Sequence, residues 1–180
     1  MKIIAIVGMA GAGKSEVARV FEQSGYVRIR FGDITDEEAE KRGLRLNEIN
    51  ERFVREAMRT EHGMAAYAKL SIPRIDRALE RANVVIDGMY SWEEYLLLKK
   101  HYGEKLIIVA VWASPRKRYF RLSVREVRSL TRKEAEERDK SEIENLNKGG
   151  PIAMADYTLT NESTLYNLKR QTQKLIERLG

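Results

Sequence analysis

The sequence contains no cysteine and only three prolines among its 180 residues. The lack of cysteine excludes disulfide bonds and thiolate metal sites, and it is typical of a cytoplasmic protein. The longest apolar runs, such as residues 106–113, are far too short to cross a bilayer, so we expect no membrane partner. Residues 1–8 lack a secretory cleavage pattern and continue directly into a glycine loop, which favours a core strand.

The composition predicts one globular domain. Hydrophobic residues make up 43% of the chain and charged residues 33%, which excludes a disordered protein. A chain of this length usually forms a single domain with a sizeable core. Abundant Lys, Arg and Glu with so little Pro and no Cys resembles the composition of thermophile proteins. The net charge of +6 favours an anionic ligand, either nucleotide phosphates or nucleic acid.

Apolar segments alternate with helical segments, which predicts an α/β fold with helices on both faces of a five-stranded parallel sheet. The first, third and fourth segments are nearly continuous Ile/Val runs, as expected of strands covered on both faces. The expected strands are residues 2–7, 27–31, 83–88, 105–112 and 156–161.

Two long, charged stretches between these strands are expected to be helical, residues 33–81 and 114–147. In the first, we predict helices over residues 35–42, 46–60 and 64–81, with Gly43 and Gly63 as breaks and His62 at a helix end rather than in a catalytic site. The second is predicted to be helical throughout. A last helix is expected over residues 165–179, with Ser163 as its N-cap.

The sequence GMAGAGKS at residues 8–15 matches G-x-x-x-x-G-K-[ST] without a gap. It lies between an expected strand and an amphipathic helix, residues 14–23, as a phosphate-binding loop requires. The glycines let successive N–H groups point inward at phosphate oxygens, and the helix N-terminus adds partial positive charge. We expect Lys14 to reach the β- and γ-phosphates and the Ser15 hydroxyl to bind Mg²⁺. The expected nucleotide contacts of this loop are Gly8, Gly11, Ala12, Gly13, Lys14, Ser15 and Glu16. The alternative is a glycine turn that only connects strand to helix.

Asp87 ends a buried apolar strand, at the edge where ligands bind in open α/β sheets. A carboxylate in this place is able to hold Mg²⁺, directly or through water. The alternative is that Asp87 caps a turn with Gly88.

Residues 114–140 hold ten Lys or Arg against five Asp or Glu. At helical spacing Phe120, Val124 and Val127 form one stripe, and a second stripe consists of Arg121, Arg125 and Arg128. Because guanidinium groups match phosphate oxygens, a one-sided arginine row favours phosphate binding over a solvated basic face, which is the alternative.

Together these motifs resemble the phosphate-loop kinases that act on nucleotides: adenylate kinase and its relatives, and dephospho-coenzyme A kinase. The chain is most similar to the uncharacterised archaeal adenylate-kinase-related group. FGD (31–33) is similar to the TGD of adenylate kinases, and VVIDG (84–88) to their third-strand element. RLSVR (121–125) is similar to the arginine pair that opens their lid, and ADYTLTNESTL (155–165) to the A-D-x-x-x-x-N segment of dephospho-coenzyme A kinase.

The resemblance implies a single phosphate-loop kinase domain over residues 1–180, with ATP and Mg²⁺ as cofactors. Its core would be residues 1–32, 82–113 and 151–180, residues 33–81 an acceptor-binding insert, and residues 114–147 a lid. Arg121 would lie near the donor adenine or its phosphates, Arg125 would stabilise charge on the transferring group, and Asn161 would border the donor base. Lid arginines that arrive only with substrate limit hydrolysis by water.

Two arginines expected of an adenylate kinase are missing from their usual places. Thr35 and Asp36 follow FGD, and Met89-Tyr90-Ser91 stands where Phe-Pro-Arg is usual. The candidates that would bind the acceptor in their stead, together with Asp33 and Gly88, are Arg30, Arg55 and Arg74.

Asp33 separates two chemistries. A hydroxyl acceptor needs a base to take its proton, whereas a monophosphate is already ionised, and Asp33 would then cap helix 35–42 or orient Mg²⁺-bound water. The arginine-bearing insert favours a nucleoside monophosphate, with AMP first. A hydroxyl kinase similar to dephospho-coenzyme A kinase is the second hypothesis. The third is a nucleotide-binding switch or RNA-associated protein with slow ATPase activity, which the lack of an aromatic-basic signature disfavours.

Overall fold

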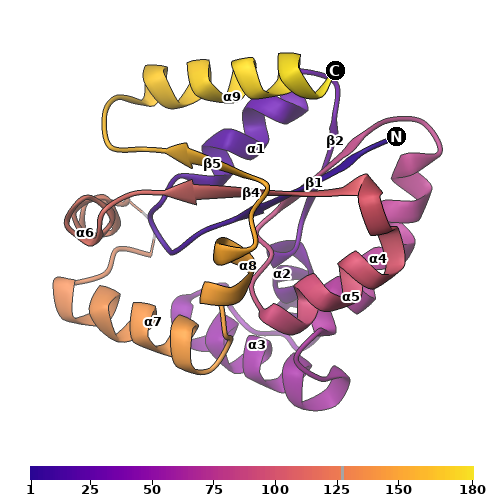
Figure 1. Ribbon diagram of the computed structural model, residues 1–180. Helices are drawn as coiled ribbons and strands as arrows, with labels where there is room; N and C mark the ends of the chain where they lie inside the picture. Colours follow the sequence, from indigo (N-terminus) through magenta and orange to yellow (C-terminus); the bar gives the residue numbers. More distant parts are fainter. Residues whose placement is uncertain (127) are drawn as a thin grey trace.

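The protein is described by a computed structural model over residues 1–126 and 128–180. It has an α/β phosphate-loop fold around a five-stranded parallel sheet in the order β2-β3-β1-β4-β5 (Figure 1). The predicted fold class is therefore confirmed. The strands are β1 (Ile3–Val7), β2 (Val27–Arg30), β3 (Val84–Asp87), β4 (Leu106–Trp112) and β5 (Tyr157–Thr160).

The helices of the described residues fall between these strands, as the alternating pattern predicts. They are α1 (Lys14–Gln23), α2 (Gly32–Lys41), α3 (Glu48–His62), α4 (Ala66–Leu79), α5 (Trp92–Tyr102), the 3₁₀ turn η1 (Gly103–Lys105), α6 (Pro115–Ser123), α7 (Arg132–Glu144), α8 (Gly149–Ala153) and α9 (Leu165–Leu179). No helix among the residues that the structure describes is both long and apolar enough to span a membrane.

The central strand β1 is buried on both faces, which explains its unbroken run of apolar residues. Ile4 and Ile6 pack with α1 and α9, while Ile3, Ala5 and Val7 pack with α2 to α5 and α8. Figure 1 shows α1 and α9 on one side of the sheet and α4, α5 and α8 on the other. The sheet is thus the middle of three layers.

The parallel register brings three strand ends together. Asp87 of β3 is the register partner of Ile6 in β1 and of Arg30 in β2. The glycine loop follows β1 and α2 follows β2, so both begin at the same sheet edge as the end of β3. This edge is where open α/β sheets bind ligands.

The insert helices differ from the prediction by a few residues. Phe31 already has helical φ and ψ, so α2 starts at Gly32 and Asp33 lies in its first turn instead of before the helix. The side chain of Asn47 accepts from Asn50 N and starts α3 two residues later than predicted. Helix α3 does end at His62, as expected. At the last helix, the N-cap is Thr164 and not Ser163.

The helical structure expected over residues 114–147 is present in α6 and α7 but not in the described residues between them. Helix α6 ends at Ser123, and a capping box between Thr131 and Glu134 starts α7. Between them Arg128 has φ of 60°, which no α-helix accommodates. The two predicted stripes are consequently not faces of one helix, and Val127 lies outside the described residues.

Candidate nucleotide-binding site

The glycine loop between β1 and α1 is closed by two contacts that exclude larger side chains. A Cβ at Gly8 would lie 2.3 Å from Val111 O, and a Cβ at Gly13 would lie 2.4 Å from Asn161 Nδ2. Gly13 is also the N-cap of α1 and has φ of 106°. These two positions accept only glycine, so the loop holds its shape against β4 and the end of β5.

Lys14, at the first position of α1, turns its side chain back over the loop. Its ammonium donates to Gly8 O at 2.9 Å and to Met9 O at 3.1 Å. Burial, together with the nearby charge of Lys148, lowers the pKa of Lys14 to about 7, while the charge of Glu142 opposes the effect. Burial in the loop therefore disfavours the charged form of Lys14, and a bound phosphate group would stabilise that form.

Ser15 and Asp87 lie together at the end of β3. The Ser15 hydroxyl donates to Asp87 Oδ1 at 3.4 Å, and Arg28 Nη2 lies 2.5 Å from Asp87 Oδ2. Asp87 is buried. A hydroxyl and a carboxylate oxygen are ligands that Mg²⁺ prefers, and Mg²⁺ usually takes only one or two carboxylates together with substrate phosphates. This pair fits that pattern, and the described part of the chain has no group of three or more His, Cys, Asp or Glu side chains arranged to hold a metal ion.

Asn161 joins the end of β5 to the glycine loop and holds Arg121. Its Nδ2 donates to Ala12 O at 2.8 Å. Arg121 Nη2 donates to the carbonyl of Asn161 at 2.8 Å and to its side-chain Oδ1 at 3.2 Å. Gly11 O also accepts from Arg121, at 3.5 Å. The two residues predicted to lie near the donor base are thus adjacent to each other and to the loop.

A cavity of about 360 Å³ opens beside the loop. Glu16, a predicted contact, lines it while pairing with Arg19 at 2.5 Å. Arg125 reaches it from beyond the end of α6, and burial and the charges of Arg138 and Arg128 lower the pKa of Arg125. The cavity is lined by Gly11, Gly13, Lys14, Ser15, Glu16, Arg121, Arg125, Asn161, Ser163 and Leu165. Most of the predicted donor-side residues therefore surround one space, whereas Gly8 and Ala12 are not among those that line it.

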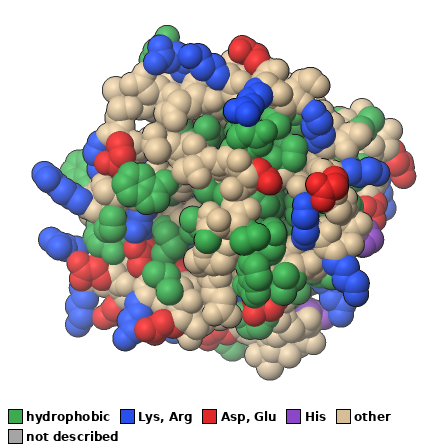
Figure 2. Space-filling model, in the orientation of Figure 1, with side chains coloured by type: hydrophobic (Ala, Val, Ile, Leu, Met, Phe, Trp, Pro, Cys, Tyr) green, Lys and Arg blue, Asp and Glu red, His purple; other side chains and the backbone are tan. Residues whose placement is uncertain are grey.

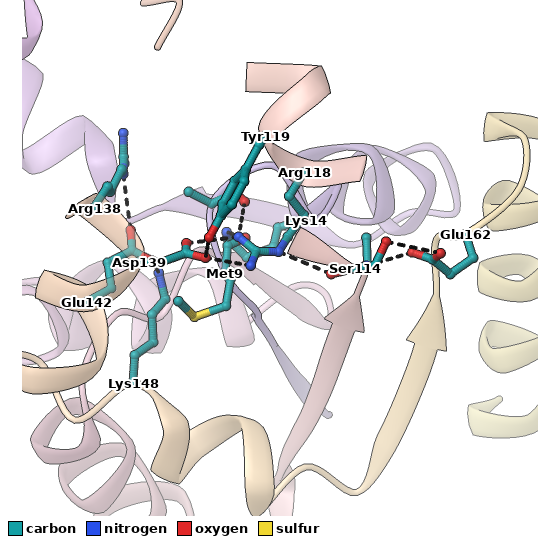
Figure 3. A network of polar contacts seen from close by, with 12 residues as sticks. Met9, Lys14, Ser114, Arg118, Tyr119, Arg138, Asp139, Glu142, Lys148 and Glu162 are labelled. Carbon is teal, nitrogen blue, oxygen red and sulfur yellow. Dashed lines mark hydrogen bonds and ion pairs between the residues drawn. The ribbon is translucent and has the colours of Figure 1, made fainter. Parts of the chain in front are cut away.

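A buried ion pair that the sequence did not reveal connects α6, α7 and the glycine loop (Figure 3). Arg118 of α6 donates to both carboxylate oxygens of Asp139 in α7, at 2.8 and 2.5 Å, and to Ala10 O at 3.1 Å. The Tyr119 hydroxyl donates to the same carboxylate at 3.0 Å. Helix α7 is therefore anchored to the glycine loop through Arg118.

Replacing Asp139 by alanine is expected to destabilise the fold by about 3–5 kcal/mol, because it leaves the buried Arg118 guanidinium without its counter-ion. Urea unfolding followed by circular dichroism measures this. The matched control is Glu136→Ala on the same helix, which removes an exposed pair with Arg132 and should change stability far less. If both variants lose the same free energy of unfolding, the Arg118–Asp139 pair contributes no more to stability than an exposed ion pair.

The candidate acceptor side is rich in carboxylates. Arg30 pairs with Asp33 at 2.7 Å and also with Asp36. Arg74 donates to both oxygens of Glu37, at 2.8 and 2.6 Å. A cleft of about 670 Å³ begins here and is lined by Asp33, Asp36, Glu37, Glu40, Gly43, Leu44 and Leu46. Two of the three arginines proposed to bind an acceptor phosphate thus already face carboxylates.

The third arginine lies where the lid meets the insert. Arg55 Nη1 is 3.5 Å from Glu51 Oε2, and Arg128 from the lid pairs with the same carboxylate. Nearby, a Cβ at Gly88 would lie 3.1 Å from the Tyr90 hydroxyl oxygen, so glycine lets this tyrosine approach the end of β3. Tyr90, like Arg28 and Arg118, carried no signal in the sequence, because its position depends on tertiary packing.

Comparison with known proteins identifies the family of the chain. An AAA domain family model (AAA_18) matches residues 4–145, the segment that holds the loop, Asp87 and the lid. A UPF0200 protein of Thermococcus sibiricus is 40% identical over 99% of this chain and 95% of its own length. A UPF0200 protein of Sulfurisphaera tokodaii is 35% identical over 99% and 98%. Thermophilic archaeal relatives agree with the composition.

Solved structures with a similar fold include kinases. Shikimate kinase from Bacteroides thetaiotaomicron has a TM-score of 0.63 and 15% identity, over 99% of this chain and 98% of that one. A gluconokinase from Sinorhizobium meliloti has a TM-score of 0.61 and 18% identity, over 99% and 93%. At these identities the likeness concerns the fold alone. The fold, the family model and the relatives agree: the chain belongs to the UPF0200 family, with a kinase-like phosphate-loop domain that implies nucleotide binding.

Proposed function

We propose that this protein is an ATP-dependent kinase that uses Mg²⁺ and phosphorylates a hydroxyl group of a small molecule. The observation that supports this most is the convergence at one sheet edge of the glycine loop with Lys14, the Ser15–Asp87 pair and, in the first turn of α2, Asp33. A phosphate-binding loop, oxygen ligands and a carboxylate base are the parts that hydroxyl phosphorylation needs.

In the proposed reaction, the acceptor hydroxyl oxygen forms a bond to the γ-phosphorus of ATP. The bond from that phosphorus to the β–γ bridging oxygen breaks, and its electron pair leaves with ADP. The proton of the hydroxyl goes to the Asp33 carboxylate. Lys14 binds the β- and γ-phosphates, and Arg125 stabilises the charge of the transferring group. Ser15 and Asp87 would hold Mg²⁺, which neutralises phosphate charge when bound.

The carboxylates around Arg30 and Arg74 favour a hydroxyl over a phosphate as acceptor. A monophosphate dianion entering the cleft would meet Asp33, Asp36, Glu37 and Glu40 and would have to displace carboxylates from both arginines. A neutral or cationic acceptor meets no such repulsion. The names of shikimate kinase and gluconokinase, which share the fold, agree with small-molecule phosphorylation.

AMP or another nucleoside monophosphate is the second candidate acceptor, as the resemblance to adenylate kinases implies. The arginines of the insert favour it, because a phosphate is able to compete with carboxylates for guanidinium groups. A role in RNA binding has less support. Figure 2 shows Lys and Arg interleaved with Asp and Glu on the face that it presents, without a one-sided basic surface.

An acceptor panel tests the proposal. Purified protein with Mg-ATP is incubated with neutral and cationic hydroxyl compounds, dephospho-coenzyme A, and AMP and other monophosphates, and ADP formation is followed. At least one hydroxyl compound should raise ADP formation well above slow hydrolysis. If AMP alone raises ADP formation, the acceptor is a nucleoside monophosphate and not a hydroxyl compound of another kind. No rise with any acceptor, together with salt-dependent RNA binding, would contradict the kinase.

Nucleotide affinity should depend on pH through Lys14. Its pKa is about 7, and bound phosphates raise it, so above pH 7 the neutral amine must take up a proton on binding. We expect the affinity for Mg-ADP to fall between pH 7 and pH 9, by at most about tenfold per pH unit. Calorimetry in buffers of different ionisation enthalpy measures the proton uptake. The same pH dependence in Lys14→Met would assign it to another group.

A further inference from the structure

Lys148, directly before α8, is a buried lysine outside every motif of the sequence. Its side chain is 1% exposed, and its ammonium lies 2.7 Å from Glu142 Oε2. Arg138 Nε lies 3.2 Å from the other oxygen of Glu142 (Figure 3). One carboxylate of α7 therefore faces two cationic side chains, of which Lys148 is buried and Arg138 is partly exposed.

This cluster adjoins the phosphate-binding lysine. Figure 3 shows Lys148 and Glu142 beside the loop residues Met9 and Lys14. After burial, the charge of Lys148 is the largest cause of the lowered pKa of Lys14, and the charge of Glu142 opposes it. Glu142 keeps its pKa at about 2 because, against its own burial, Lys148, Lys14 and Arg138 all favour the carboxylate. The two ammonium groups thus act on each other and share one counter-ion.

Lys148 also points toward the candidate acceptor side. Its ammonium lies 5.5 Å from the centre of the Tyr90 ring. Tyr90 follows Asp87 and Gly88, and its hydroxyl lies against Gly88. The ammonium is therefore placed between the loop that holds Lys14 and the strand end that leads to the acceptor.

Glu142 is the counter-ion of several cations at once. Lys148, Lys14 and Arg138 all favour its carboxylate, whereas burial raises the pKa of Glu94, the other buried carboxyl group near Lys148, to about 7. Burying a lysine close to another cation is costly unless an anion compensates it. A phosphoryl group is an anion of that kind, and its transfer takes place beside Lys14.

We propose that Lys148 is a second phosphate-binding lysine, which contacts the γ-phosphoryl group of ATP together with Lys14, while Glu142 and Arg138 hold its ammonium in position. The inference rests on the proposed function. As the β–γ bridging oxygen leaves with its electron pair and the acceptor oxygen approaches phosphorus, Lys148 stabilises the negative charge on the equatorial oxygens. It neither gives nor takes a proton in this step.

The test removes the ammonium without leaving a buried charge alone. In Lys148→Met/Glu142→Gln, both members of the pair become neutral at nearly the same volume, which avoids the unfolding expected of a single Lys148 variant. The matched control is Lys140→Met/Glu144→Gln, an exposed lysine–glutamate pair on the same helix α7. Folding is checked by thermal melting, and affinities for Mg-ATP and Mg-ADP are measured by calorimetry.

We expect the Lys148→Met/Glu142→Gln variant to bind Mg-ATP about ten- to a hundredfold more weakly than the wild type and to bind Mg-ADP within about threefold, since only ATP has the γ-phosphate. Turnover should fall by about 10²- to 10³-fold. The Glu142→Gln single variant keeps the ammonium and loses one of the two side chains that position it, so we expect its ATP affinity to fall less than that of the double variant.

The affinities separate this inference from the kinase itself. If no acceptor is phosphorylated by the wild type, a selective loss of ATP over ADP binding in the double variant still supports Lys148 as a γ-phosphate ligand. Unchanged ATP affinity in a folded double variant overturns it, even where the wild type transfers phosphate.

Discussion

The Lys14→Ala variant is expected to lower the rate of phosphoryl transfer by about 10²- to 10³-fold or more. Lys14 lies at the start of α1 with its ammonium over the loop, within 2.9 Å of Gly8 O and 3.1 Å of Met9 O. Its removal takes away the charge that would meet the β- and γ-phosphates. The change also removes a buried ammonium whose charged form is disfavoured by burial, so the fold should survive it.

Initial rates of ADP formation at saturating acceptor measure this effect. The control is Lys169→Ala, an exposed lysine on α9, which should leave the rate unchanged. A Lys14→Ala variant that is folded and retains wild-type turnover would contradict the assignment of the loop as the donor site.

The Asp33→Asn variant is expected to lower transfer to a hydroxyl acceptor by about 10²- to 10⁴-fold, because amide oxygen does not accept the hydroxyl proton. Affinity for Mg-ADP should stay within about twofold, since Asp33 lies in the first turn of α2 and not in the nucleotide cavity. Single-turnover rates and calorimetry measure the two quantities.

The control for this change is Asp76→Asn, an exposed carboxylate of α4 in the same insert, which pairs with Tyr102. It should leave turnover nearly unchanged. A small effect of Asp33→Asn, together with phosphorylation of AMP, would assign Asp33 a structural role and favour the monophosphate acceptor.

The sheet and the loop were predictable because their signals are local. The apolar run of β1 and the glycine pattern of residues 8–15 each require a particular backbone conformation. Both are recognisable from neighbouring residues alone, without knowledge of tertiary contacts. Asp87 and Asn161 were placed correctly at strand ends for the same reason. Their roles toward a nucleotide stay predictions.

The separation of α6 from α7 was harder to predict, because it depends on a helix cap and on a local backbone conformation, which hydrophobic periodicity does not report. The segment between Ser123 and Thr131 has helix-forming residues, yet the capping box of Thr131 and the positive φ of Arg128 end the helical pattern. Average propensity over such a window favours a helix, and tertiary contacts override it.

The buried ion pairs were invisible for a different reason. Arg118 and Asp139 are 21 residues apart, Arg28 and Asp87 are 59 apart, and Lys148 is six residues from Glu142, a spacing that no helix face produces. Each pair exists only because the sheet and lid bring separate segments together. Sequence therefore indicated where a nucleotide would bind, but not which charges surround its phosphates.

The most direct test of the account follows the γ-phosphate itself. Wild-type protein, Mg²⁺ and ATP labelled in the γ-phosphate are incubated with the hydroxyl compounds and with AMP, and the labelled products are separated. The account predicts label on a hydroxyl oxygen of the acceptor, at a rate that falls in Lys14→Ala and Asp33→Asn. Label that appears only as inorganic phosphate, with every acceptor unlabelled, would contradict it.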